Sequence, residues 1–173
     1  MDDDLQRALV FTEMGSILPV ERLITRSESI VIALPLIRVY RFACLLQVEV
    51  VVNHNAMPDE RWDALRSSLF HAPAVPEGST DGILRFTVNY ADGVEISTGQ
   101  EFEDGEPGLS LAPSGASGTT AATLVQMNLW LQPLPPAKEF ALMTEWSASG
   151  IRPATIELDG AAIAKAAARS HRY

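Results

Sequence analysis

Residues 84–93 read LRFTVNYADG, and this stretch decides the fold class. From residue 84 to residue 90 apolar side chains alternate with polar ones, the period-two pattern of a strand that buries one face. The Asp-Gly pair that follows, with a second short apolar run at residues 94–98, is the strongest short-range signal of a tight hairpin turn. We therefore predict a β-hairpin over residues 86–96.

The same alternation recurs through much of the chain. It is strongest in residues 46–52, 125–132 and 140–146, and shorter runs lie at residues 20–26, 29–34, 35–40, 108–111 and 154–158. Roughly eight to ten strands separated by turn residues are typical of a sandwich or barrel. We therefore predict a mainly β protein: an antiparallel β-sandwich, immunoglobulin-like or jelly-roll in topology, with two short α-helices. Its core should come from Leu46, Val48, Val50, Leu84, Phe86, Val88, Val125, Met127, Leu129, Phe140 and Leu142.

Two segments have helical character. Pro58 and the two acids after it are a typical helix start, because proline suits the first turn and carboxylates face the positive end of the helix dipole. Apolar residues then continue at helical spacing to about Phe70. Asp159 is a good N-cap for a second, alanine-rich helix that reaches Ala168. No strand–helix–strand repeat is present, so a parallel α/β fold is not expected.

Charge and composition exclude several classes of partner. The 173 residues carry 13 Lys+Arg against 22 Asp+Glu, a net charge of −9. Nucleic acid and anionic lipid both reward dense positive charge, so we expect neither as a partner. The most apolar stretch, residues 29–52, is interrupted by Arg38 and Glu49, which a bilayer would penalise. With no recognisable secretory signal and a single cysteine, Cys44, we expect a cytoplasmic protein that has no membrane segment.

The length suits one domain. We predict an N-terminal extension at residues 1–19 and a single β-sandwich domain at residues 20–173, with a flexible loop at residues 99–123. That loop begins with acids and continues with small residues such as glycine and serine. Loops of this length in a compact domain are usually functional or mobile, and this composition favours mobility.

The acids of that loop are the one candidate metal site. Carboxylates are ligands that Ca²⁺ prefers, but these do not follow the spacing of the helical calcium loop. A solvated acidic loop is therefore the favoured interpretation, and calcium binding is the alternative. The candidate ligands are Glu101, Glu103, Asp104 and Glu106.

Motifs for catalysis are absent from the sequence. It contains no P-loop, no dinucleotide-binding glycine pattern and no Gly-x-Ser-x-Gly nucleophile elbow. His54, His71 and His171 are remote from one another and from Cys44, so no local metal or nucleophile cluster forms. The sequence therefore predicts no cofactor and favours a non-catalytic role.

Two tryptophans are the candidate ligand contacts. Trp130 alternates with the predicted core and should share the outer face of its strand with Asn128. An outward tryptophan beside amide side chains can stack on a sugar or contact a protein. The alternative is that a helix covers this face and buries Trp130. Trp146, on another predicted strand, is the second candidate.

The C-terminal third contains three distinctive short motifs. Residues 129–136 read LWLQPLPP, residues 145–151 read EWSASGI and residues 157–159 read ELD. Together with residues 84–93 and 24–28, these motifs resemble a family of uncharacterised actinobacterial proteins, over most of the chain from residue 20 onward. The family has no assigned activity, so the resemblance implies a cytoplasmic β-sandwich and supplies no catalytic residues.

Two functional hypotheses follow. The first is a non-catalytic interaction module that binds a protein partner, or self-associates, through a sheet face or edge. The second is a small-ligand or carbohydrate-binding sandwich, possibly enzymatic, that uses the tryptophans and the acidic loop. Sandwiches host both classes, so the fold does not choose between them.

Overall fold

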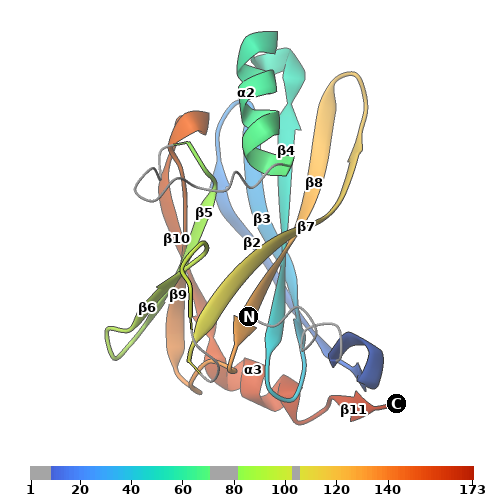
Figure 1. Ribbon diagram of the computed structural model, residues 1–173, viewed down its shortest axis with the longest axis vertical. Coiled ribbons are helices and arrows are strands. Elements are labelled where there is room, and N and C mark those ends of the chain that lie inside the picture. Colours follow the sequence, from blue (N-terminus) through green and yellow to red (C-terminus); the bar gives the residue numbers. More distant parts are fainter. Residues whose placement is uncertain (1–8, 71–81, 103–105) are drawn as a thin grey trace.

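The computed structural model describes residues 9–70, 82–102 and 106–173, and it is a β-sandwich (Figure 1). One sheet has five strands in the order β2-β3-β4-β8-β7: β2 (Ser16–Arg26), β3 (Ile30–Val39), β4 (Cys44–Asn53), β8 (Ala122–Gln132) and β7 (Gly108–Gly118). The other has four strands in the order β10-β9-β5-β6: β10 (Ile151–Asp159), β9 (Glu139–Trp146), β5 (Arg85–Tyr90) and β6 (Glu95–Ser97). Neighbouring strands are antiparallel throughout. The predicted mainly β sandwich is confirmed.

The core lies between the two sheets and matches the predicted one. Every residue predicted for it is at most 2% exposed. These residues come from alternate positions of β4, β5, β8 and β9, plus Leu84 just before β5. The alternation decides this result because successive side chains of a strand point to opposite faces.

The predicted hairpin is confirmed as β5–β6. Val88 pairs with Ile96, and the turn between the strands has Gly93 at φ 88°. The Gly93 N–H donates to the Tyr90 carbonyl at 3.0 Å, and the Val94 N–H donates to the Asp92 carboxylate at 3.1 Å. The Asp-Gly pair thus provides the side-chain acceptor and the positive φ that this turn needs.

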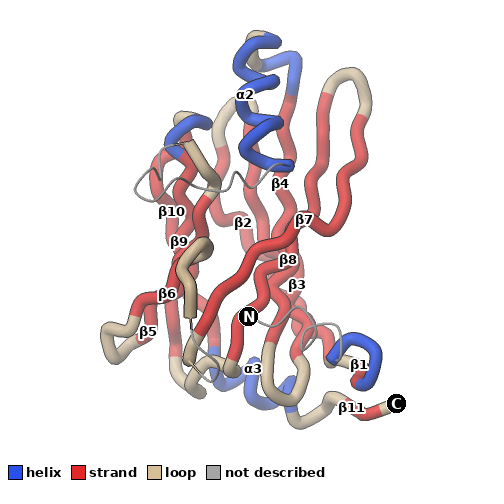
Figure 2. The backbone as a smooth tube through the Cα atoms, in the orientation of Figure 1, coloured by secondary structure: helices blue, strands red, loops and turns tan. Residues whose placement is uncertain are grey.

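Two helices lie at opposite ends of the sandwich, as Figures 1 and 2 show. The helix α2 (Asp59–Phe70) buries Leu65 and Leu69 in the core, and α3 (Gly160–Ala167) buries Ile163 and Ala166 there. Asp159 caps α3 as predicted, because its carboxylate accepts hydrogen bonds from the N–H groups of the first two alanines. Short 3₁₀ turns follow β4 (η1, His54–Ala56) and β9 (η2, Ser147–Ser149).

The two chain ends meet in a small third sheet. β1 (Glu13–Met14) pairs with β11 (His171–Arg172), and the Tyr173 N–H donates to the Thr12 carbonyl at 3.1 Å. Residues 9–12, just before β1, are helical. Because β2 begins at Ser16, the predicted boundary of the N-terminal extension at residue 19 lies inside the first long strand.

The predicted loop at residues 99–123 is wrong where β7 lies, and the short run predicted at residues 108–111 is the start of this strand. β7 occupies eleven of these residues and pairs with β8 from Gly108 to Gly118. This strand is rich in glycine, serine and alanine, so it has little apolar alternation to reveal it. Its backbone hydrogen bonds to β8, rather than its side chains, define it as a strand.

Candidate functional site

Trp146 belongs to the core. It is 1% exposed at the end of β9, and its neighbours are buried apolar side chains of both sheets. A stacking platform must present its ring to the solvent. Trp146 therefore has a structural role and is not a surface contact.

Trp130 lies on the outer face of the five-stranded sheet, as predicted, but it is buried. Its ring stacks on Tyr40 with centroids 5.5 Å apart, and it clusters with Ala43 and Leu45. Leu9, from the helical residues before β1, packs against this cluster. The cover is therefore the N-terminal segment, while α2 and α3 close the ends of the sandwich, and Trp130 is not an exposed stacking platform.

Asn128 lies two residues before Trp130 on β8, so both side chains are on the outer face of the sheet. It pairs with Gln47 of β4 and is half-buried. Its Oδ1 atom is buried, and no hydrogen-bond donor reaches it in the described part of the chain. An unpaired buried acceptor destabilises the fold by about 1–3 kcal/mol. Asn128 is thus a weak point of this face rather than an open ligand contact.

The acidic candidate site is only partly described. Glu101 and Glu106 are exposed, whereas Glu103 and Asp104 lie outside the described residues. Among the residues that the structure describes, no three side chains of histidine, cysteine, aspartate or glutamate gather as metal ligands would. The geometry therefore adds no support to the calcium hypothesis.

The single thiol of the chain is buried. Burial raises the pKa of the Cys44 thiol to about 12, so it stays protonated and unreactive at neutral pH. Burial is also the main reason that the pKa of Tyr90 is raised, with smaller contributions from Cys44 and Asp92. The His54 ring packs at a tilt against Trp62, with centroids 4.3 Å apart. His54 Nε2 also hydrogen-bonds with the Thr123 hydroxyl at 2.9 Å, which connects η1 to β8.

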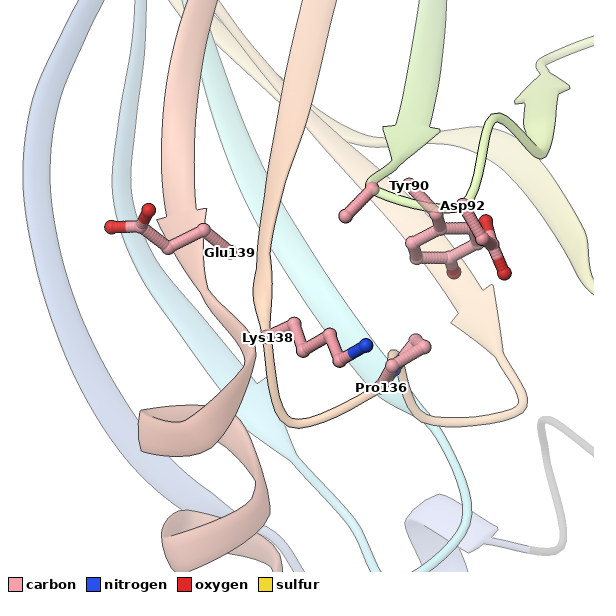
Figure 3. Close-up of a pocket in the computed structure, with 6 residues that line it drawn as sticks. Tyr90, Asp92, Pro136, Lys138 and Glu139 are labelled. Atoms are coloured by element: carbon pink, nitrogen blue, oxygen red, sulfur yellow. The ribbon is translucent and has the colours of Figure 1, made fainter.

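One hollow lies where the β5–β6 turn meets the β8–β9 connection (Figure 3). Its volume is about 60 Å³, far below the roughly 300–1,000 Å³ of typical ligand sites. Figure 3 shows Lys138 extending toward Pro136 while Glu139 points to the opposite side, so their charges do not converge. The hollow has room for water and offers little to an organic ligand.

The outer face of the five-stranded sheet carries few charges. Cross-strand register places its outward residues in rows across β2, β3, β4 and β8. One row contains Arg26, Val31, Val51 and Leu124, the next Leu23, Ala33, Glu49 and Gln126, and the next Pro19, Leu36, Gln47 and Asn128. In a chain of net charge −9, these rows hold only Arg26 and Glu49 as charged residues.

Beyond these rows, large apolar side chains gather where the chain ends meet. We call them the terminal surface: Phe11 (78% exposed), Met14 (49%), Ile17 (48%), Phe42 (64%) and Tyr173 (80%). They come from residues 11–17, which span the end of the helical segment, β1 and the start of β2, from the β3–β4 turn and from the C-terminus. Backbone pairing joins the first and last of these segments.

Two contacts attach the β3–β4 turn to this assembly. The Glu13 carboxylate accepts a hydrogen bond from the Arg41 N–H at 2.8 Å. Gly15 permits the close approach, because a Cβ atom there would lie 2.8 Å from Cγ of Arg38 and 3.0 Å from Cε1 of Tyr40. The three segments are therefore neighbours in the fold.

Two exposed arginines, Arg41 and Arg172, lie on the same segments as these apolar residues. The Arg41 guanidinium carbon lies 5.9 Å from the centre of the Phe42 ring, a cation–π arrangement, and Arg172 pairs with Glu13 through the backbone. Burial raises the pKa of Tyr40, nearby Arg38 opposes the rise, and Tyr173 and Glu13 add to it. Sequence reasoning missed this surface because its residues have no periodicity and come from three segments, the last of which lies more than a hundred positions from the others.

Comparison with known proteins yields no relative: no family model, curated protein or solved structure matches this chain. Among the described residues, no helix is long and apolar enough to span a membrane.

Proposed function

We propose that this protein is a non-catalytic protein-binding module whose binding site is the terminal surface. The observation that carries the proposal is the exposure of Phe11, Phe42 and Tyr173 together with Met14, beside arginine side chains. Aromatic residues, methionine and arginine are the types enriched at protein–protein interfaces. Large apolar side chains are unfavourable in contact with water, and a partner that covered them would remove this apolar surface from water.

Face binding is better supported than strand addition at an edge. Each edge strand carries a feature that hinders pairing with another chain. β2 is irregular at Pro19 and has Glu21 at φ 52°, while β10 is irregular around Pro153. β7 is irregular after Pro113, and β6 has only three residues. The partner is therefore proposed to contact side chains rather than to extend a sheet.

The partner is proposed to be a different protein rather than a second copy. A two-fold dimer brings the same surface of both subunits together. Both copies would then bring Arg41 and Arg172 into one interface, and like charges in an interface oppose association. The buried free thiol of Cys44 suits a reducing compartment, so a cytoplasmic location is part of the proposal.

A peptide-display selection tests the proposal. Wild-type protein should enrich peptides that the Phe11→Ser/Phe42→Ser variant fails to retain, because both side chains are exposed and their loss should leave the fold intact. Val94→Ser is the matched control, since Val94 is 44% exposed in the β5–β6 turn, outside the terminal surface. Peptides that bind the double variant equally well, or a selection that enriches nothing, would contradict the proposal. Sedimentation equilibrium adds one more outcome, since a dimer lost in the double variant would replace the partner with a second copy.

A further inference from the structure

We infer that the partner segment recognised by the terminal surface is acidic: a polypeptide stretch in which carboxylates flank an apolar side chain. This inference rests on the proposed function and names its partner class. The surface combines exposed aromatic rings with Arg41 and Arg172, whereas the chain as a whole has a net charge of −9. In residues 9–17, 41–42 and 171–173 the exposed charged side chains are both arginines.

The guanidinium groups are available to a ligand. In the residues that the structure describes, no carboxylate forms an ion pair with Arg41 or Arg172, and both residues are exposed. The nearest acid, Glu13, is 4% exposed, and its Oε1 atom already accepts the Arg41 backbone N–H. A guanidinium donates two parallel hydrogen bonds to a carboxylate, so an acidic segment would satisfy these groups.

The apolar groups lie close enough to act with the arginines. The Arg41 guanidinium lies beside the Phe42 ring. Arg172 pairs through the backbone with Glu13, whose carboxylate accepts the Arg41 N–H, so both arginines lie on segments that adjoin Glu13. A segment that packed an apolar side chain against Phe42 would therefore place a neighbouring carboxylate near Arg41, with Arg172 on the adjoining strand. Apolar contact provides affinity in such an arrangement, and charge provides selectivity.

A polypeptide segment is favoured over an anionic membrane. Charges separated by more than about 8 Å are largely screened at physiological salt, so a short segment senses mainly the local arginines. A membrane plane instead faces a wide area of a protein whose net charge is −9. Two exposed arginines are few for a lipid surface, where stable binding commonly uses a larger basic cluster.

Fluorescence anisotropy with three labelled peptides tests the inference. The peptides share length and apolar positions and carry aspartate and glutamate, serine and glutamine, or lysine between them. We expect the acidic peptide to bind about tenfold more tightly than the lysine peptide, with an affinity that falls as salt rises. Arg41→Glu/Arg172→Glu should reverse this order. Arg152→Glu, an exposed site on β10, is the control and should preserve it.

The outcomes separate the inference from the proposed function. If all three peptides bind wild type equally and Phe11→Ser/Phe42→Ser abolishes their binding, the acidic partner is wrong while the protein-binding module stands. If no peptide binds, both are overturned. Co-sedimentation with phosphatidylcholine–phosphatidylserine vesicles that depends on Arg41 and Arg172 would overturn the inference in favour of a membrane surface.

Discussion

The inner and outer faces of the five-stranded sheet differ in what covers them. Along β4 the inward residues Leu46, Val48 and Val50 are fully buried beneath the opposite sheet. On the outer face, Leu45 and its cross-strand partner Trp130 are buried by Tyr40 and the N-terminal segment, whereas the rows beyond them are half-exposed. The inner face is thus covered along its length by the opposite sheet. The outer face is covered only near Trp130, where the N-terminal segment crosses it.

This difference explains why the proposed binding site lies beside the covered end of the outer face. The segment that buries Trp130 leads directly into β1, whose pairing with β11 presents Met14 and Tyr173. Each of the following variants tests one face against the other, and they are arranged from the largest expected effect to the smallest.

Leu129→Ala tests the inner face. Leu129 is fully buried in β8, and the truncation leaves a cavity that two packed sheets cannot close. We expect the free energy of unfolding to fall by about 3 kcal/mol, measured by urea denaturation with an unchanged slope. A loss below about 1 kcal/mol would mean that the inner face repacks easily.

Trp130→Ala tests the covered end of the outer face, one residue further along β8. We expect a smaller loss of about 2 kcal/mol, below the roughly 3–5 kcal/mol typical of Trp→Ala in a closed core, because Leu9 and Tyr40 can move into part of the vacated volume. Urea denaturation measures the loss, and Trp130→Phe should restore part of it by preserving the stack on Tyr40. A larger loss than that of Leu129→Ala would show that the two faces are equally rigid.

Alkaline pH tests whether the inner face keeps the buried Cys44 thiol in its neutral form. Folding raises the pKa of Cys44 from 9.0 to about 12. Below pH 9 the thiol is neutral in both states and the stability is complete. Between about pH 9 and 12 it ionises only when unfolded, so the free energy of unfolding falls by at most about 1.4 kcal/mol per pH unit. Urea titrations across this range should show a shallower fall for Cys44→Ala, and identical slopes would contradict the prediction.

Asn128→Val tests the unpaired acceptor on the outer face. The substitution removes the buried Oδ1 atom and introduces a side chain that suits a strand. We expect a gain of about 1 kcal/mol in thermal or urea unfolding. Gln126→Val, exposed on the same face, is the control and should change little. Destabilisation by Asn128→Val would mean that its oxygen has a partner after all.

Ile17→Ser tests the uncovered part of the outer face. Ile17 is 48% exposed on an edge strand, so the free energy of unfolding should stay within about 0.5 kcal/mol of wild type. The same variant should weaken peptide binding to the terminal surface. Melting curves and anisotropy on one preparation separate these effects, and a large loss of stability would place Ile17 in the core instead.

Local patterns predicted the parts of the fold that depend on neighbouring residues. The alternation in β4, β5, β8 and β9 identified the buried face, the Asp-Gly pair identified the β5–β6 turn, and Asp159 identified the start of α3. Beyond the short run at residues 108–111, β7 was missed because small residues form a strand there only through pairing with β8. The predicted surface role of Trp130 failed because alternation indicates which face a side chain occupies, not what covers that face.

The sequence by itself determined the β-sandwich class, the core and the two helices. Strand alternation, turn residues and helix caps each depend on residues that are near one another in sequence. Only the tertiary structure decided which outward residues are buried and which gather into a surface. The terminal surface joins residue 11, residue 42 and residue 173, and their proximity follows from the β1–β11 pairing and the Glu13–Arg41 hydrogen bond. Contacts between residues so distant in sequence leave no local pattern, so three-dimensional packing alone brings them together.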